Sequence, residues 1–263
     1  MNPSDDLGHP WHRRAPATRV VSLVPSLTES VASVERRALV GATEWCIEPP
    51  DLDVVRVRGT KNPDVEAIIG LEPDVVLAAQ EENRRIDVER LRGRGVPVWV
   101  TSIESLDEAF ASLRRMFEVA LGWPVPPWVG AAESAWGALP EVSTRHTCVV
   151  PIWRDPWMVV GSQTFAADLL SRLGFDNLYA GRYPSVTVAE IAALAPDVVV
   201  LPDEPYRFTA KDGPEAFVGL TTALVDGRAL TWYGPSLVTA RGILEDALER
   251  AVGAGPGGLD GRP

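Results

Sequence analysis

The chain has 263 residues, 46% of them hydrophobic, so it is long enough to bury one large core or two smaller ones. Its 36 Asp and Glu residues outnumber 25 Lys and Arg residues, which gives a formal net charge of −11. This balance argues against a protein that binds duplex nucleic acid or an anionic membrane surface, because both need clustered basic side chains.

The first residues of the chain do not resemble an export signal. The first 19 residues lack the apolar core of a signal peptide, and no stretch reaches the ~20 apolar residues of a membrane span. We therefore expect residues 1–17 to form a disordered tail and the protein to be cytoplasmic, without membrane insertion. Cys46 and Cys148 are too few and too far apart for a disulfide framework or a structural zinc site.

The next part of the chain alternates between short apolar runs and helical patterns. Strands are predicted over 20–24, 39–42, 75–79 and 96–100, and helices over 27–34, 65–71 and 88–94. Continuous apolar strands that alternate with helices indicate a parallel sheet with both faces covered. This predicts an N-terminal α/β lobe over residues 18–103.

A long helical pattern then interrupts the alternation, and we expect residues 104–140 to form a helical connector. A second α/β lobe is predicted over residues 141–252, followed by a disordered tail over 253–263. Its predicted strands are 148–153, 198–201 and 229–232, and its predicted helices are 165–173, 188–194 and 237–252. The predicted fold class is thus α/β, with two Rossmann-like lobes of mainly parallel sheets joined by a helical connector.

Ligands of open parallel sheets sit beyond the carboxyl ends of the strands, so the loops after the predicted strands are the candidate site. These loops are rich in aromatic, charged and polar side chains. The candidate ligand-binding residues are Ser26, Glu44, Trp45, Cys46, Thr60, Lys61, Glu82, Asn83, Arg84, Trp153, Arg154, Trp157, Tyr183, Glu204, Tyr206, Trp232, Tyr233 and Arg241.

Several of these residues have a structural alternative. Ser26 could cap a helix, and Glu82 and Arg84 could belong to a solvated loop. Trp157 and Trp232 are stronger candidates for ligand contact, because a loop tip offers little core in which to bury an indole.

Specific motifs resemble the helical-backbone metal receptor superfamily, and in particular a branch without signal peptides. In the first half they are VVSLVPSLTE, TEWCIEPP, GTKNPDVEAI and the EEN triplet; in the second half they are WRDPWMVVGSQTFAADLLSRLGF, RYP, DEPYRF and VDGRALTWYGPSL. The superfamily includes solute-binding proteins that present vitamin B12, haem and ferric siderophores to ABC importers. The resemblance implies a ligand held in the cleft between two lobes bridged by a long helix.

Exported members of that superfamily dock on the importer through one glutamate on each lobe. Glu66 matches the first of these positions, whereas Ala189 stands at the second and Glu190 follows one step later, about 100° around the helix. The resemblance therefore predicts a remnant of one docking charge and the loss of the other. Glu66 could equally be an acidic residue that stabilises the first turn of a helix.

We expect the protein to bind a corrinoid, haem or ferric chelate for intracellular sequestration, delivery or sensing, with no intrinsic cofactor. Aromatic faces would cover the ligand, and Arg84, Arg154 and Arg241 would bind its anionic groups. No direct metal ligand is predicted, although Cys46 is a weak candidate. One alternative is an importer receptor whose export signal lies upstream. The other is a small-molecule enzyme with Cys46 as nucleophile and Glu44 or Glu204 as proton carrier.

Overall fold

The computed structural model describes residues 3–12, 16–137 and 144–254. The chain forms two compact units, each with its own parallel sheet, which confirms the predicted α/β fold class. Unit 1 comprises Met1–Ile103, Asp107–Ala131 and Tyr233–Pro235, and unit 2 comprises Glu104–Leu106, Ala132–Trp232 and Ser236–Pro263. Within the described ranges, no helix is both long and apolar enough to cross a membrane.

Unit 1 is built on a five-stranded sheet in which all neighbouring strands are parallel. In spatial order the strands are β3 (Val55–Arg56), β2 (Leu39–Ala42), β1 (Val20–Ser22), β6 (Val75–Ala79) and β7 (Val98–Thr101). Every residue of β1, β6 and β7 is buried. Both faces of these strands are therefore covered, which explains why their sequences are continuous apolar runs.

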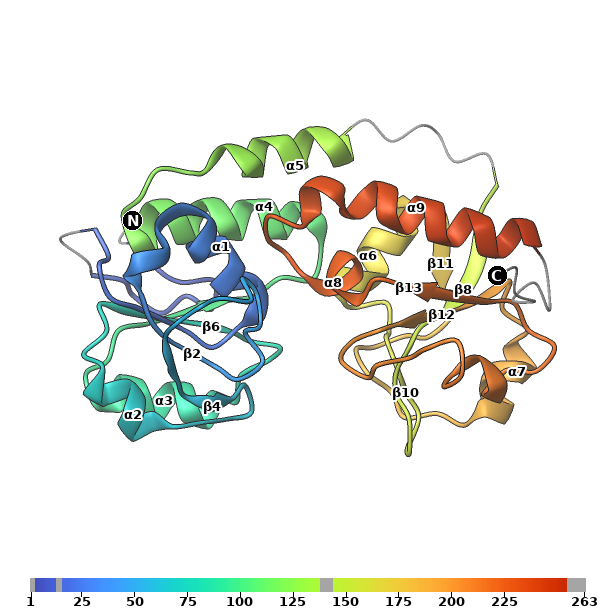
Figure 1. Ribbon diagram of the computed structural model, residues 1–263, viewed down its shortest axis with the longest axis horizontal. Coiled ribbons are helices and arrows are strands. Elements are labelled where there is room, and N and C mark those ends of the chain that lie inside the picture. The colour runs from blue at the N-terminus through green and yellow to red at the C-terminus, as the bar shows by residue number, and fades with distance from the viewer. Residues whose placement is uncertain (1–2, 13–15, 138–143, 255–263) are drawn as a thin grey trace. The chain divides into compact units, whose positions relative to one another are not determined.

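Helices cover both faces of the unit 1 sheet (Figure 1). On one face, Ile68 and Leu91 pack with Val76 and Val98 in the main core. This face is covered by α2 (Val65–Gly70) and α3 (Arg85–Gly93), and the other by α1 (Pro25–Glu35), α4 (Leu106–Arg115) and the π-helical η2 (Met116–Leu121). Two small elements complete the unit, the 3-10 turn η1 (Arg36–Ala38) and the hairpin of β4 (Arg58–Gly59) with β5 (Asn62–Pro63).

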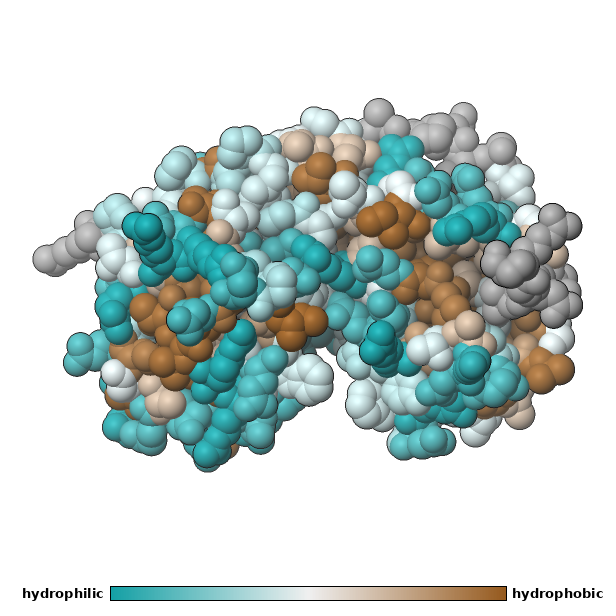
Figure 2. All heavy atoms as spheres, viewed as in Figure 1, coloured by the Kyte–Doolittle hydropathy of each residue, from teal (hydrophilic) through white to brown (hydrophobic). Residues whose placement is uncertain are grey.

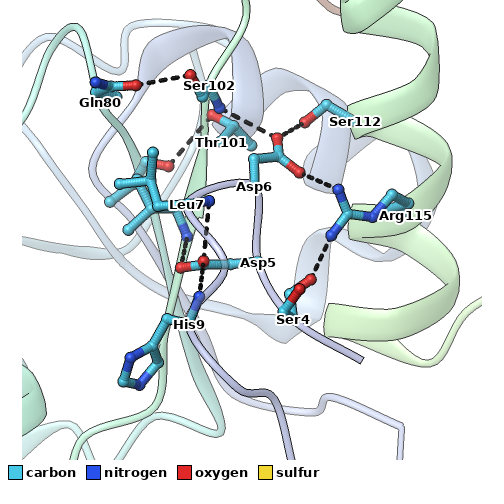
Figure 3. Close-up of polar contacts among 12 residues, drawn as sticks. Ser4, Asp5, Asp6, Leu7, His9, Gln80, Thr101, Ser102, Ser112 and Arg115 are labelled. Carbon is cyan, nitrogen blue, oxygen red and sulfur yellow. Dashed lines mark hydrogen bonds and ion pairs between the residues drawn. The ribbon is translucent and has the colours of Figure 1, made fainter. Parts of the chain in front are cut away.

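The described residues 3–12 pack against unit 1, so the prediction of a disordered tail is wrong for them (Figure 3). The Asp6 backbone N–H donates to the Val100 carbonyl on the edge strand β7, at 3.2 Å. The Asp6 carboxylate accepts from the Arg115 guanidinium at 2.7 Å and from the Ser102 backbone N–H at 3.1 Å. These two partners of the Asp6 carboxylate lie about a hundred residues further along the chain. The composition of the first residues therefore does not reveal that they pack against unit 1.

Unit 2 contains a four-stranded parallel sheet and a short antiparallel hairpin. The sheet order is β11 (Phe175–Asn177), β8 (His146–Val149), β12 (Val198–Pro202) and β13 (Thr222–Val225), and the hairpin joins β9 (Pro151–Trp153) to β10 (Met158–Val159). The helices are α6 (Phe165–Arg172), α7 (Val188–Leu194), the 3-10 turn η3 (Pro214–Ala216), α8 (Gly227–Thr231) and α9 (Leu237–Ala254).

One predicted strand of unit 2 is wrong. Residues 229–232 were expected to be a strand, but α8 occupies most of this segment and β13 precedes it. The Asp226 carboxylate accepts from the Ala229 backbone N–H at 2.9 Å and so caps the first turn of α8. An Asp-Gly pair that resembles a turn between strands therefore starts a helix instead.

The segment predicted as a connector is divided between the units. The apolar positions of its first part, including Phe110, Leu113 and Phe117, are buried, and Gly122 ends that helix with a φ of 68°. In α5 (Pro127–Gly137), residues up to Ala131 belong to unit 1 and the later ones to unit 2. Residues 138–143 of the predicted connector, and the predicted tail from residue 255 on, lie outside the described residues.

Candidate functional site

In each unit the parallel strands end at the same edge of the sheet, and we call this the carboxyl-end edge of that unit. Loops from several strands gather at such an edge, which is the usual position of ligands in open parallel sheets. In unit 1 the predicted site residues follow β1, β2, β3 and β6, and in unit 2 they follow β8, β11 and β12. Arg241 lies instead on α9, whereas Trp232 and Tyr233 follow α8.

Trp45 is the most exposed aromatic side chain of the unit 1 edge, at 64%. Its indole lies over Gly59 of the β4–β5 hairpin: a Cβ at residue 59 would be 3.3 Å from the Trp45 Nε1 atom. The Arg56 guanidinium holds the loop beneath it by donating to the Thr43 and Cys46 carbonyls, at 3.0 and 2.8 Å. These hydrogen bonds hold the loop that carries Trp45 in a fixed position.

Cys46 is fully buried next to Trp45. Its Sγ atom lies 3.0 Å from the Thr28 hydroxyl and 3.1 Å from the Thr43 hydroxyl. Burial raises the pKa of the Cys46 thiol, and the two threonine hydroxyls only partly offset this effect. Because the thiolate is the nucleophile and the metal ligand, burial and the raised pKa do not favour the predicted roles of Cys46, which remain predictions.

Tyr233 and Ser26 lie together inside unit 1 and not at its surface. Tyr233 is 5% exposed and forms a hydrogen bond with Thr101, and burial raises the pKa of its hydroxyl. A Cβ at Gly234 would come within 3.1 Å of the Ser26 carbonyl, so this segment runs close against the start of α1. The sequence predicts that both residues contact a ligand. The structure buries them beneath the carboxyl-end edge, in a layer that we call the floor of this edge.

Asn83 also holds unit 1 together. Its Oδ1 atom accepts from the Ala79 backbone N–H at 2.9 Å, and its Nδ2 atom donates to the Thr60 carbonyl at 2.9 Å and to the Leu23 carbonyl at 3.4 Å. The buried amide therefore ties the loops after β1, β3 and β6 to one another. Its hydrogen-bonding groups are used by the backbone, so the structure gives Asn83 a structural role, and its contact with a ligand remains a prediction.

Charged side chains surround this floor. Glu44 and Lys61 are exposed, Thr60 and Glu82 are half-buried, and the Lys61 ammonium donates to the Glu81 carbonyl at 2.7 Å. The Glu82 carboxylate lies near enough to help raise the pKa of both Cys46 and Tyr233. Arg84 is tied to the buried Asp87 carboxylate at 2.7 Å, so it is held by unit 1 itself.

At the unit 2 edge, five aromatic rings contact one another in a series that begins at the exposed Trp153. Trp153 is 46% exposed and meets Tyr206 edge to face, with ring centroids 5.7 Å apart. Tyr206 contacts Phe208 at 4.7 Å, Trp157 stacks on Phe208 at 5.9 Å, and Phe217 lies 5.1 Å from Trp157. Trp157 is thus half-buried and packs against this aromatic cluster, and its contact with a ligand remains a prediction.

Arg154 braces the same cluster. Its guanidinium lies 5.1 Å from the Trp157 ring centroid and forms ion pairs with Asp212 and, at 2.7 Å, with Glu215. The Tyr206 hydroxyl donates to the other Asp212 oxygen at 2.8 Å, and this bond raises the pKa of Tyr206. Arg154 was predicted to bind an anionic ligand group, but two carboxylates of unit 2 neutralise it.

Glu204 follows β12 and is half-buried against Trp232, which is itself only 7% exposed. Burial raises the pKa of Glu204, a hydrogen bond from the Trp232 side chain counteracts this, and the nearby Asp203 and Asp226 charges raise it further. The Arg228 guanidinium lies over the Trp232 ring, 5.3 Å from the ring centroid. The predicted exposure of Trp232 is wrong because it fills this polar corner.

The two remaining candidates differ in accessibility. Tyr183 is 37% exposed on the loop after β11. Arg241, on α9, pairs with Glu245 at 2.8 Å and donates to the Ala135 carbonyl at 2.9 Å, and its contact with a ligand remains a prediction. Among the described residues, no three His, Cys, Asp or Glu side chains are arranged to hold a metal ion.

Sequence reasoning did not identify the residues that organise these edges. Arg56, Phe208, Asp212, Glu215 and Phe217 hold the exposed aromatic side chains in place. Their partners are up to 61 residues away, and such pairs leave no local pattern. The one available signal was the high density of aromatic and acidic residues between 203 and 217.

No family model matches this chain. A vitamin B12-binding protein of Vibrio cholerae is 25% identical over 197 residues, which cover 70% of each chain. A cobalamin-binding protein of Halobacterium salinarum is 27% identical over 231 residues, which cover 81% of this chain and 62% of the relative. These relatives are binding proteins and not enzymes, in agreement with the predicted class.

The solved structures agree with the fold. The periplasmic vitamin B12-binding protein of Vibrio cholerae superposes with a TM-score of 0.70 at 19% identity, over 90% of this chain and 98% of the other. A periplasmic haem-binding protein of Pseudomonas aeruginosa gives 0.70 at 23% identity, over 90% and 92%. A Helicobacter pylori protein in a nickel–histidine complex gives 0.78 at 14% identity, over 99% and 91%.

Proposed function

We propose that this chain, whose fold and curated relatives are those of the helical-backbone metal receptor superfamily, binds a small metal-chelate ligand of the corrinoid, haem or siderophore class. The observation that carries the proposal is the pair of exposed indoles, Trp45 and Trp153, each held at a carboxyl-end edge by contacts within its own unit. Flat, rigid aromatic faces suit a flat macrocycle or an aromatic chelate, since little side-chain entropy is lost on binding.

A direct test is to purify the protein from its native host and to record its absorption spectrum and metal content. Calorimetry with a corrinoid, haem and a ferric chelate then measures affinity. A protein that is colourless and metal-free and binds none of the three would refute the proposal.

Single-residue variants test the two edges separately. Trp45→Ala and Trp153→Ala are each expected to weaken binding about 5- to 10-fold, or roughly 1 kcal/mol per indole. Val34→Ala near the end of α1 and Ile243→Ala on α9 are matched controls, because both side chains are exposed but lie on helices away from the carboxyl-end edges. Unchanged affinity in both Trp variants would show that the ligand binds at another place on the protein.

We also propose that the chain acts inside the cell. In support, Ala189 occupies the position that the resemblance assigns to the second docking glutamate, and the Glu190 carboxylate accepts from the Thr187 backbone N–H at 2.6 Å in a capping box. Glu66, the counterpart in unit 1, forms an ion pair with Arg94 at 2.9 Å. Cell fractionation tests this proposal, and recovery of the protein outside the cytoplasm would favour the importer-receptor alternative.

A further inference from the structure

The charges at the two carboxyl-end edges narrow the ligand class. Resting on the proposed function, we infer that the ligand is a neutral or cationic metal chelate, and that a chelate bearing carboxylates is rejected. The inference follows from two independent features of the described residues: the arginines expected to bind anionic groups are engaged within the units, and carboxylates gather at the edges.

The arginines are engaged by carboxylates of their own units. Arg84 pairs with Asp87, whose side chain is only 3% exposed, Arg154 pairs with Glu215 at 2.7 Å, and Arg241 pairs with Glu245 at 2.8 Å. Turning Arg84 towards a ligand would remove one of the cations beside a buried carboxylate, which is costly. An anionic ligand would therefore compete with existing ion pairs.

Carboxylates outnumber cations on the loops that form the unit 1 edge. Glu44 is exposed beside Trp45, and Glu81 and Glu82 follow β6. The field of Glu82 reaches Cys46 and Tyr233 in the floor of the edge. The exposed Lys61 ammonium adds one positive charge, and Arg58 is paired with Asp64 at 3.3 Å, so the carboxylates remain in excess. A cation that approaches Trp45 therefore meets an attractive field, and an anion meets repulsion.

Carboxylates also gather around Glu204 at the unit 2 edge, although Arg207 and Lys211 are exposed further along the same loop. Asp203 and Asp226 are both close enough to act on the Glu204 carboxyl. The Asp203 carboxylate accepts from the Gly227 backbone N–H at 2.7 Å, which fixes it at this corner. The Arg228 guanidinium lies over the Trp232 ring, where it balances part of this charge. A ligand carboxylate at this corner would add to a group of like charges.

Polar residues and apolar residues both lie on the surface of each unit. Hydrophilic residues cover much of the visible face of each unit, with apolar patches between them (Figure 2). The exposed indoles supply apolar contact within an acidic surrounding. That combination suits a macrocycle whose periphery is amide-bearing or cationic, and it does not suit one with ionised acid side chains.

The test compares ligands that share a ring and differ in charge. Cobinamide carries amide side chains and a net positive charge, and cobyrinic acid is the same macrocycle with carboxylates in place of the amides. Calorimetry on the full chain is expected to give at least about 10-fold tighter binding of cobinamide, a difference that shrinks as salt is raised. Haemin and ferric citrate serve as further anionic chelates.

Variants then test whether the preference for cobinamide arises from the unit 1 edge. Glu44→Gln combined with Glu82→Gln is expected to lower the affinity for cobinamide by about 3- to 10-fold and to narrow its advantage over cobyrinic acid. Glu72→Gln is the matched control, because Glu72 is exposed three residues before β6 and so lies at the opposite edge of the same sheet.

Each outcome is decisive. Equal or tighter binding of cobyrinic acid, haemin or ferric citrate overturns the charge inference and leaves the proposed function standing. Binding of none of the four chelates overturns the proposed function and the inference with it. A cobinamide preference that the double Gln variant leaves intact overturns the assignment of that preference to the unit 1 edge.

Discussion

The Trp11 indole meets the Trp99 ring edge to face, with ring centroids 5.3 Å apart. Trp11 is 5% exposed, and its Nε1–H donates to the Val119 carbonyl at 3.0 Å. A residue near the start of the chain thus covers the edge strand β7 and contacts η2. This relationship makes residues 3–12 part of the unit 1 core and leads to the first prediction.

Trp11→Ala should destabilise unit 1 by about 3 kcal/mol, because it removes a buried ring and a hydrogen bond at once. Urea unfolding followed by circular dichroism measures the free energy of unfolding. Leu7→Ala is the control, since Leu7 is 51% exposed in the same segment and should change stability by less than about 0.5 kcal/mol. Equal effects of the two substitutions would show that the segment does not pack as described.

A second prediction concerns pH. Burial raises the pKa of Cys148 from its ordinary 9.0 to about 12. Between these values the folded state keeps a proton that the unfolded state loses. Stability from this thiol is therefore full below pH 9 and is lost as the pH rises towards 12, by at most about 1.4 kcal/mol per pH unit.

Urea titrations of the wild-type protein and of Cys148→Ala at pH 8 and pH 10.5 check this prediction. The variant is expected to be less stable at pH 8, because a buried side chain is truncated, but to lose less stability on going to pH 10.5. Parallel losses in the two proteins would refute it.

Glu204 provides a third prediction with the same sign. Its raised pKa means that the folded state favours the protonated carboxyl, so its stabilising contribution is present at acid pH and is lost as the pH rises through the folded-state pKa. Glu204→Gln keeps a hydrogen-bond acceptor for Trp232 and removes the charge. It should raise the free energy of unfolding at pH 7 by roughly 1 kcal/mol or less.

The control for Glu204 is the same comparison at pH 4, where the gain from Glu204→Gln should be smaller. Asp203→Asn provides a second comparison, because it removes a neighbouring charge that raises the Glu204 pKa. If Glu204→Gln raises the free energy of unfolding more at pH 4 than at pH 7, the folded state does not disfavour the charged Glu204 carboxylate.

The fold could be predicted from the sequence because its signals are local. The apolar run of β6 and the Pro-Asp pair before it are continuous in the chain, and so are their counterparts at β12. The candidate edges could also be predicted, since the loops that follow strands are known once the strands are. Trp45, Trp153 and Tyr183 are exposed there, although their contact with a ligand remains a prediction.

The exposure of individual site residues could not be predicted in the same way. Trp157 and Trp232 resemble Trp153 in the sequence, but Phe208 covers the first and the Glu204 corner buries the second. Arg154 looks available until Asp212 and Glu215 are placed beside it. Whether a loop side chain is free depends on partners brought in by tertiary packing, which one sequence does not reveal.

The last prediction concerns Gly59, which the close approach of the β4–β5 hairpin requires. A Cβ at this position would lie 2.6 Å from the Asn62 Oδ1 atom and 3.3 Å from the Trp45 Nε1 atom. Gly59→Ala should therefore displace the Trp45 indole. If Trp45 contacts the ligand, affinity falls about 3- to 10-fold, while the free energy of unfolding falls by no more than about 1–2 kcal/mol.

Gly70→Ala is the matched control, because a Cβ at Gly70, the last residue of α2, would meet nothing within 4 Å. Calorimetry gives the affinity of each variant, and quenching of tryptophan fluorescence by iodide shows whether an exposed indole has moved. In a Trp45→Ala background, Gly59→Ala should cause no further loss of affinity, since the side chain through which it acts is absent. An additive loss in the double variant would instead mean that the hairpin contacts the ligand directly and that Trp45 does not mediate the effect.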